Sequence, residues 1–261
     1  MLDRQSPFLP RNPNDIATLA EQRILSDIVS GKLLPGQRLS EQSLCRNYKF
    51  GRGIIRTVLS RLSHREFVIS HARSGWRVVP VTAIGLREIT LGRRQLEPLL
   101  AEVDLFQRDI ERIEAICDMQ AAIASHTGMS ADRLSLLRRY EREILDILAG
   151  QIKAPVIAGW LANLWDRSEY YLNFLEAAAP MKLKPADWSV YIDAKKAGRI
   201  KDAAAFIRKT GDAFAAFTQA QLLQSDLEMP VARKPRKRTA VGEDLSSVHS
   251  THPPATSKRI L

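Results

Sequence analysis

The feature that most constrains this fold is a change of hydrophobic periodicity near residue 66. Before that point, apolar residues recur three and four positions apart, which is typical of amphipathic helices. After it come two short segments rich in aromatic and β-branched residues, FVIS (67–70) and WRVV (76–79). They are separated by HARSG, which ends in Gly75, and this combination predicts a β-hairpin.

The segments before the hairpin are helical. Helices are expected over residues 15–30, 41–47 and 52–65. Pro35-Gly36 indicates a turn, and Ser40 is a good N-cap for the second helix. Three helices followed by a hairpin are the order of a winged helix-turn-helix, so we expect this fold for residues 15–80.

From about residue 82 onward every long segment has a helical pattern, and no strand-like alternation occurs. The expected helices cover residues 84–103, 110–124, 134–148, 155–177, 186–197 and 200–224. The predicted fold class is therefore mainly α, with an N-terminal winged helix-turn-helix and a C-terminal all-α helical bundle. The expected domains are a flexible arm (1–14), the winged helix-turn-helix (15–80), a helical effector-binding and dimerisation domain (81–225) and a disordered basic tail (226–261).

The net charge of +10 is unevenly distributed. Residues 1–80 contain 13 Lys and Arg against 6 Asp and Glu, whereas residues 81–225 contain 19 of each. A basic module on a neutral body is the electrostatic footprint of a polyanion partner such as nucleic acid. A basic solvated face without a partner is the alternative that charge alone leaves open.

Several other classes of protein are disfavoured. No apolar run approaches the roughly 20 residues needed to span a bilayer, and the N-terminus lacks the apolar core of a signal peptide, so we expect a cytoplasmic protein without membrane contact. Cys45 and Cys117 form no metal or redox motif, which fits a reducing compartment. An enzyme is not expected, because the chain has no Ser/His/Asp order, no clustered histidines and no Gly-rich phosphate loop.

Two arginines are the strongest candidates for reading DNA. Arg52 and Arg56 are one helical turn apart at the start of the expected third helix, so they share a face. In a helix-turn-helix this helix lies in the major groove with its N-terminal residues at base edges, and arginine pairs with guanine through two hydrogen bonds. The alternative is that both arginines are solvated on an ordinary surface helix. At the expected hairpin tip, Arg73 and Gly75 suit a phosphate or a narrow groove.

Residues 16–79 resemble the DNA-binding domain of GntR-type bacterial transcription regulators. The matching positions are Gly31, Leu33, Pro35, Gly36, Leu39, Glu41, Leu44, Arg52, Arg56, Val58, Leu59 and Leu62. The resemblance implies double-stranded DNA as partner, and the DNA-contact candidates are Ser40, Gln42, Gly51, Arg52, Gly53, Arg56, Arg73 and Gly75. The family's Ser-Arg-Thr is Gly-Arg-Gly here, and its glycine before the wing is Glu66.

The second half resembles the helical effector domain of the FadR branch, the FCD type. The stretches that carry this resemblance are LREITLGRRQLEPLLAEV (86–103), YEREILDILAG (140–150) and AKKAGRIKDAAAFIRK (194–209). Many such domains bind a metal through one Asp and three His. The matching positions here hold Leu137, Glu141, Trp188 and Thr210, so we expect no metal and no cofactor.

Arg93, Glu141, Trp188 and Thr210 are the candidates for contacting an effector, with a small organic acid as the candidate ligand. A buried Arg93 must find an anion or acceptors, so a ligand clamp and a structural pair with Glu141 are both open. The expected function is a DNA-binding transcription regulator, more often a repressor in this family, that binds a pseudo-palindromic operator as a homodimer and responds to a metabolite. The alternative is a helical domain that only dimerises or binds a protein partner.

Overall fold

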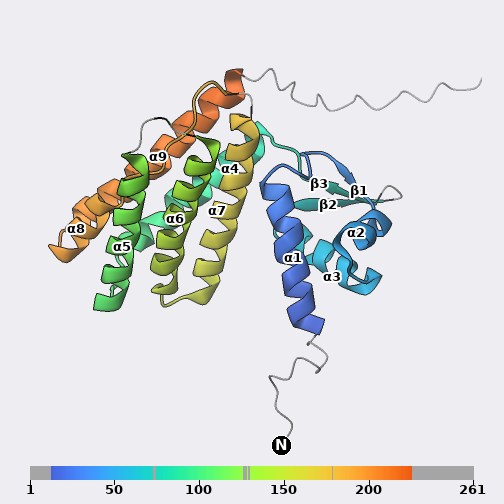
Figure 1. The fold of residues 1–261 in the computed structure, drawn as a ribbon, viewed down its shortest axis with the longest axis horizontal. Helices are drawn as coiled ribbons and strands as arrows, with labels where there is room; N and C mark the ends of the chain where they lie inside the picture. The colour runs from blue at the N-terminus through green and yellow to red at the C-terminus, as the bar shows by residue number, and fades with distance from the viewer. Residues whose placement is uncertain (1–12, 73–74, 126–127, 129, 178, 225–261) are drawn as a thin grey trace, which may run out of the picture. The chain divides into compact units, whose positions relative to one another are not determined.

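The computed structural model of this chain describes residues 13–72, 75–125, 128, 130–177 and 179–224. The expected basic tail (226–261), Arg73 and nearly all of the expected flexible arm (1–14) lie outside these residues. Within the described residues the expected fold class is confirmed: a winged helix-turn-helix precedes a region made of helices (Figure 1).

The N-terminal part contains the expected helices and hairpin. Its elements are α1 (Pro13–Val29), β1 (Arg38–Leu39), α2 (Glu41–Tyr48), α3 (Arg52–His64), β2 (Val68–His71) and β3 (Gly75–Val78). The sheet has the strand order β1-β3-β2, and both pairings are antiparallel. Strand β1 was not predicted, because two residues are too few to show an alternating pattern.

Local sequence explains where these helices begin. Helix α1 starts at Pro13 rather than near Asp15, and proline is well tolerated in a first helical turn because its missing N–H would have no helical partner there. Ser40 is the N-cap of α2, and its hydroxyl accepts a hydrogen bond from the Ser43 amide at 3.4 Å.

The helical part begins after Thr82, whose hydroxyl accepts from the Gly85 amide as the N-cap of the first helix. Its elements are α4 (Ala83–Leu96), the 3₁₀ turn η1 (Glu97–Ala101), α5 (Gln107–Ala124), α6 (Ala131–Gly150), α7 (Pro155–Glu176), α8 (Ser189–Lys196) and α9 (Ile200–Gln224). Figure 1 shows α5, α6 and α7 side by side, with α9 packed against α4 and α7.

The expected continuous helix over 84–103 is wrong. Helix α4 ends at Leu96, and the chain continues as the 3₁₀ turn η1. Pro98 lies in the first turn of η1, where it lacks the N–H that an α-helix would need and its ring would clash with the preceding turn. The helix expected from residue 186 likewise starts later, at Ser189.

Two groups of buried side chains hold the described residues together. One combines α1, α3 and the hairpin with residues of the helical part, including Ile24, Leu59, Phe67, Ile89 and Tyr171. The other lies among η1 and helices α5 to α9 and includes Trp188 and Tyr191. The first group therefore joins the winged helix-turn-helix to helices α4 and α7 of the helical part. Among the described helices, none is both long and apolar enough to cross a membrane.

Candidate nucleic-acid interface and helical-domain pocket

Helix α3 presents its two candidate arginines to solvent. Arg52 and Arg56 are exposed, whereas the opposite face of the helix is buried in the domain core. That buried face consists of Ile55, Val58, Leu59 and Leu62. The spacing of four places both guanidinium groups on the free side of the first turns, where they can meet a ligand of the domain.

Arg56 is oriented by a residue of the preceding helix. Its Nε lies 2.9 Å from Glu41 Oε2, and Glu41 stands in the first turn of α2. The Arg56 side chain is 63% exposed, so this ion pair contributes little stability and can be exchanged for another anion at low cost. The contact joins α2 to α3 and holds the guanidinium at the surface.

The N-terminus of α3 is open. Gly51 is the N-cap and supplies no side-chain hydrogen bond to the helix. A Cβ added at Gly51 or Gly53 would meet nothing within 4 Å, so neither glycine is required by packing. The unsatisfied backbone N–H groups of the first turn remain available to an anion such as a phosphate.

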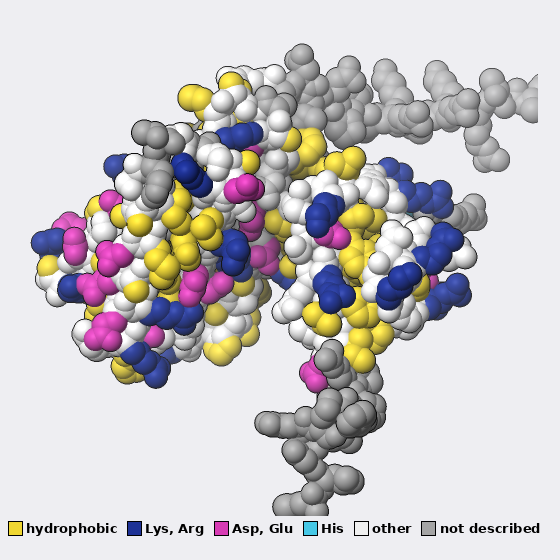
Figure 2. All heavy atoms as spheres, in the orientation of Figure 1, with side chains coloured by type: hydrophobic (Ala, Val, Ile, Leu, Met, Phe, Trp, Pro, Cys, Tyr) yellow, Lys and Arg dark blue, Asp and Glu magenta, His cyan; other side chains and the backbone are white. Residues whose placement is uncertain are grey.

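The wing and α2 provide the other candidates. Gly75 has a φ of +79°, a conformation that side chains rarely adopt, so glycine is required there by the turn itself. Ser40 and Gln42 are exposed at the start of α2, although Ser40 is also engaged as a cap. Figure 2 shows Lys and Arg side chains gathered along the edge formed by α2, α3 and the sheet. The exposed basic residues of this domain include Arg38, Arg46, Lys49, Arg52, Arg56 and Arg77.

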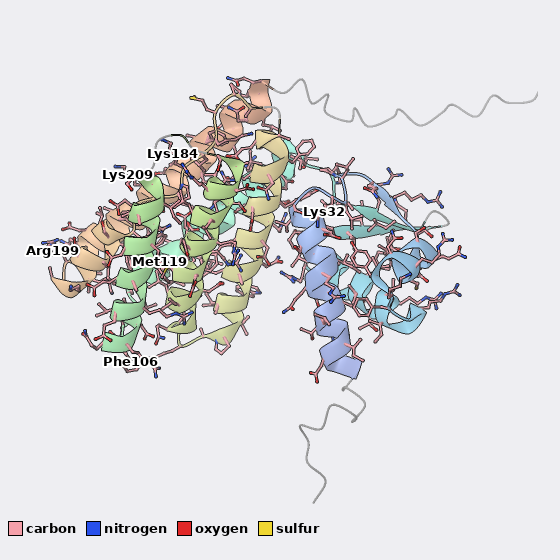
Figure 3. All side chains as sticks on the ribbon, in the orientation of Figure 1. Lys32, Phe106, Met119, Lys184, Arg199 and Lys209 are labelled. Carbon is pink, nitrogen blue, oxygen red and sulfur yellow. The ribbon has the colours of Figure 1, made fainter. Side chains whose placement is uncertain are left out.

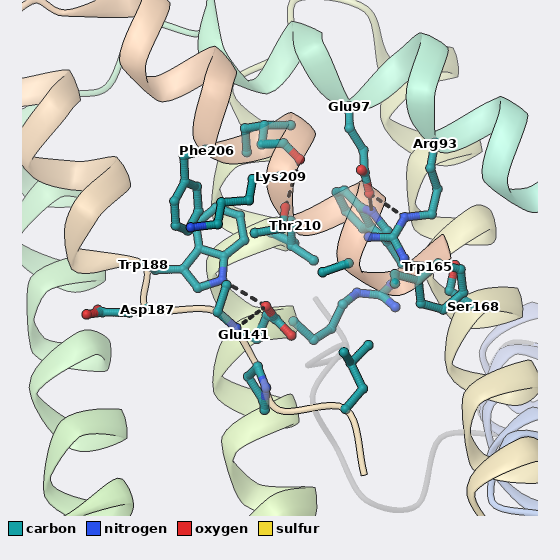
Figure 4. Close-up of a pocket in the computed structure, with 18 of the residues that line it drawn as sticks. Arg93, Glu97, Glu141, Trp165, Ser168, Asp187, Trp188, Phe206, Lys209 and Thr210 are labelled. Atoms are coloured by element: carbon teal, nitrogen blue, oxygen red, sulfur yellow. Dashed lines mark hydrogen bonds and ion pairs between the residues drawn. The ribbon is translucent and has the colours of Figure 1, made fainter. Parts of the chain in front are cut away.

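The helical part contains a pocket of about 610 Å³, which brings together all four residues singled out from the sequence (Figure 4). Arg93 comes from α4, Glu141 from α6, Trp188 from the N-cap of α8 and Thr210 from α9. Aromatic and aliphatic side chains supply most of the wall, among them Trp165, Phe206, Phe214, Leu100 and Leu172. A volume of this size and this mixture of groups suit a small organic molecule.

Of the two alternatives that the sequence left open for Arg93, the structural pair is made with Glu97 and not with Glu141. Arg93 Nε donates to Glu97 Oε1 at 2.6 Å, one turn further along the chain, and the guanidinium lies 4.4 Å from the centre of the Phe214 ring. The same Glu97 oxygen accepts from Trp165 Nε1 at 2.9 Å (Figure 4). Because Glu97 is buried and directly adjacent, it satisfies Arg93 without help from α6.

Glu141 has different partners. Its Oε1 accepts from Trp188 Nε1 at 3.0 Å and from the Ala186 amide at 3.2 Å. Burial raises the pKa of Glu141 above its ordinary value, although these hydrogen bonds and the nearby charges of Arg93 and Arg138 act in the opposite direction. Glu141 therefore fixes the Trp188 ring and the loop before α8 in the pocket wall.

Several pocket residues were not identified from the sequence. Arg138 and Arg142 of α6 line the pocket, together with the exposed Lys184 and Lys209, which Figure 3 labels. Arg138 makes a bidentate pair with Glu176 at 2.7 and 2.9 Å. These residues carry no local motif, because their common location arises only when separate helices pack.

The positions that match the family's metal ligands, among them Leu137 and Thr210, hold other kinds of side chain. The Thr210 hydroxyl donates to the Ile207 carbonyl at 2.8 Å within its own helix. Leu137 is buried and apolar. In the part of the chain that the structure describes, no three His, Cys, Asp or Glu side chains are grouped so that they could hold a metal ion.

One face of α7 contacts the winged helix-turn-helix. Arg65, the C-cap of α3, donates to Asp166 Oδ2 at 2.5 Å and to Asn163 Oδ1 at 3.2 Å. Arg167 lies 2.5 Å from Glu66, and the Tyr170 hydroxyl donates to the Val79 carbonyl, also at 2.5 Å. Polar contacts thus join α7 to the end of α3 and to the segment that follows β3.

Comparison with known proteins agrees with this architecture. Residues 17–78 match the family of bacterial regulatory proteins described as the gntR family, which confirms that the N-terminal region is a helix-turn-helix domain of this type. An uncharacterised HTH-type transcriptional regulator, BphR, of Paraburkholderia xenovorans strain LB400 is 32% identical over 92 residues. That match covers 35% of this chain and 38% of BphR, so the chain spans well under half of this curated relative.

Two solved structures share the fold. The E. coli protein McbR/YncC is 18% identical with a TM-score of 0.65, and the match covers 79% of this chain and 98% of that protein. A candidate GntR transcriptional regulator from Rhodococcus sp. RHA1 is 17% identical with a TM-score of 0.61 and the same coverage. At these identities the likeness concerns the fold, and it extends beyond the winged helix-turn-helix into the helical part.

Proposed function

We propose, from the gntR-type domain at residues 17–78, that this chain is a sequence-specific DNA-binding transcription regulator. The observation that carries the proposal is the exposure of Arg52 and Arg56 at the start of α3, in a domain whose family regulates transcription. Arg52 reads a base edge or a phosphate, and Arg56 contacts the DNA backbone beside the groove. The chain acts as a homodimer on a pseudo-palindromic operator, most simply as a repressor.

We further propose that the helical domain, residues 81–225, is of the FCD type and senses a small organic acid. Support comes from the pocket of about 610 Å³, whose apolar wall also carries Arg93, Arg138 and Arg142. The apolar part of such a ligand would pack against the aromatic side chains of the wall, and its acid group would pair with the arginines. Binding of the effector changes the affinity for DNA, and DNA must change the affinity for the effector by the same factor.

DNA binding is tested by selecting bound sequences from a random pool with the full chain. We expect an imperfect palindrome whose half-sites are about one helical turn apart. In gel-shift assays on the recovered sequence, R52A should abolish specific binding and R56A should weaken it, while both proteins stay folded. R112A, on α5 of the helical domain, is the matched control. Unchanged binding by both R52A and R56A would overturn the proposal.

Effector sensing is tested by thermal shift with a panel of small aliphatic and aromatic acids. A ligand at 100 times its Kd stabilises the folded state by about 2.7 kcal/mol, which is readily measured. The expected result is at least one acid that raises the Tm of the wild type and raises that of W188A much less. No stabilising ligand across a broad panel would favour the alternative, a helical domain that only dimerises or binds a protein.

A further inference from the structure

Helix α7 separates the pocket from the winged helix-turn-helix by the thickness of one helix. Its residues Trp165, Ser168, Glu169 and Leu172 line the pocket. Its residues Asn163, Asp166, Arg167, Tyr170 and Asn173 make the polar contacts with the N-terminal domain. Each set recurs three and four positions apart, so the two sets occupy two faces of the same helix.

Asp166 is the residue at which these two environments meet. Its Oδ2 accepts from Arg65 of the N-terminal domain and its Oδ1 accepts from Arg142 of α6, each at 2.5 Å. The Asp166 side chain is only 18% exposed. One partly buried carboxylate is thus held in place by two guanidinium groups, one on each oxygen.

On the N-terminal side, Arg65 is the C-cap of α3. Besides Asp166 it contacts Glu21 of α1 at 3.1 Å and lies over the Phe67 ring. The Arg65 carbonyl accepts from the Asn163 amide group at 3.3 Å. The orientation of the Asp166 carboxylate therefore bears directly on how the end of the DNA-reading helix is held.

On the other side, Arg142 lines the pocket. Its guanidinium also pairs with Asp146 at 2.9 Å and lies 5.5 Å from the centre of the Trp165 ring, which is itself part of the wall. An acid group entering beside Arg142 would compete with Asp166 for the same guanidinium N–H groups, since both are carboxylates.

We propose that Asp166 transmits ligand binding in the pocket to α3. An anionic group of the ligand withdraws Arg142 from Asp166, and the contact between Asp166 and Arg65 then weakens. This inference rests on the proposed sensing function and adds the route by which sensing reaches the DNA-binding domain. Losing one of its two guanidinium partners leaves the carboxylate free to turn, so the Arg65 contact is no longer fixed in one geometry.

The test uses R142M in the full chain, without DNA or effector, because this change removes from Asp166 the guanidinium that a ligand would withdraw. The readout is amide hydrogen exchange in a peptide covering residues 60–70. This peptide contains the amides of Arg65, Glu66 and Phe67, which are hydrogen-bonded to the last turn of α3. We expect exchange in this peptide to accelerate about two- to tenfold, the size of effect that is typical when two contacting residues such as Arg142 and Asp166 are coupled. A peptide within α5 should exchange as in the wild type.

Matched variants separate a specific link from general destabilisation. R139M changes an exposed arginine of the same helix and should leave exchange at 60–70 unchanged. R142K keeps a cation and should stay close to the wild type. D166N should accelerate exchange by itself, and adding R142M to D166N should produce no further acceleration.

Unchanged exchange at 60–70 in R142M, equal acceleration in R142M and R139M, or additive effects in the double variant would each overturn the inference. Because neither DNA nor effector is present, this result is independent of the operator selection and the thermal-shift panel. The proposed function and the proposed link can therefore fail separately.

Discussion

Glu66 combines an unfavourable backbone conformation with an ion pair to the helical part. Its φ is +61°, in the left-handed region where most side chains are strained. GntR-type domains commonly have glycine at this position, just before the wing. Here the side chain is used instead: the Glu66 carboxylate lies 2.5 Å from Arg167 of α7, whose side chain is only 12% exposed.

Replacing Glu66 separates the backbone cost from the side-chain gain. Neither E66A nor E66G has the carboxylate, so both lose the contact with Arg167, but only glycine is unstrained at this φ. We expect E66G to be more stable than E66A by about 1 kcal/mol in denaturant unfolding. Equal stabilities would mean that the left-handed conformation is absent in solution.

Glu141 is predicted to make stability depend on pH. A carboxyl group whose pKa is higher in the folded than in the unfolded protein binds more protons when folded. Stability therefore falls as the pH rises from 4.5, the ordinary pKa of a glutamate, through the raised pKa of Glu141. Glutamine keeps an acceptor for Trp188 Nε1 but cannot ionise. We expect E141Q to have a higher Tm than the wild type at pH 8, and the difference should shrink on acidification toward pH 4. A Tm difference independent of pH would contradict this.

At the scale of elements, the first turn of α3 contains residues that make the helix less stable than its surroundings would allow. Gly51 gives the helix no side-chain cap and Gly53 weakens its first turn, yet space is open beside both. The two glycines leave the backbone N–H groups at the helix start accessible from solvent. This favours an anion-binding role over a stability role for the element.

Two glycine substitutions should have opposite effects. G53A fills open space in a helix and should stabilise the protein by about 0.5–1 kcal/mol, whereas G75A forces alanine into a positive φ and should destabilise it by at least as much. Thermal and denaturant unfolding of the two variants give the comparison. Destabilisation by G53A would show that Gly53 is closely packed in solution.

The sequence predicts those elements whose position is set by residues close together in the chain. Helices α2 and α3 and the hairpin were located closely, because Ser40, the apolar face of α3 and the change of period are all local features. Strand β1 and the break at Leu96 were missed, since one depends on pairing with β3 and the other on a single proline. The Arg93–Glu97 pair and the pocket contributions of Arg138 and Arg142 depend on how the helices pack, which no local pattern records.

At the scale of the whole molecule, charge is concentrated where DNA contact is proposed. If Arg56 contacts a phosphate in each protomer of a dimer, the slope of log Kd against log salt should be smaller by about 2 in R56A than in the wild type, at about 0.9 per contact. Fluorescence anisotropy of a labelled operator over a range of KCl concentrations measures it. R112A should keep the wild-type slope; a wild-type slope in R56A would remove Arg56 from the phosphate contacts.

The two-faced character of α7 has a consequence for engineering. Residues such as Ser168 and Glu169 can be varied to accept a differently shaped ligand while Asn163, Arg167 and Tyr170, which contact the N-terminal domain, are left untouched. If the helical domain senses an effector as proposed, ligand choice and signal output are set by separate positions of one helix. A library restricted to the first set would retune which compound a reporter strain detects while keeping its promoter unchanged.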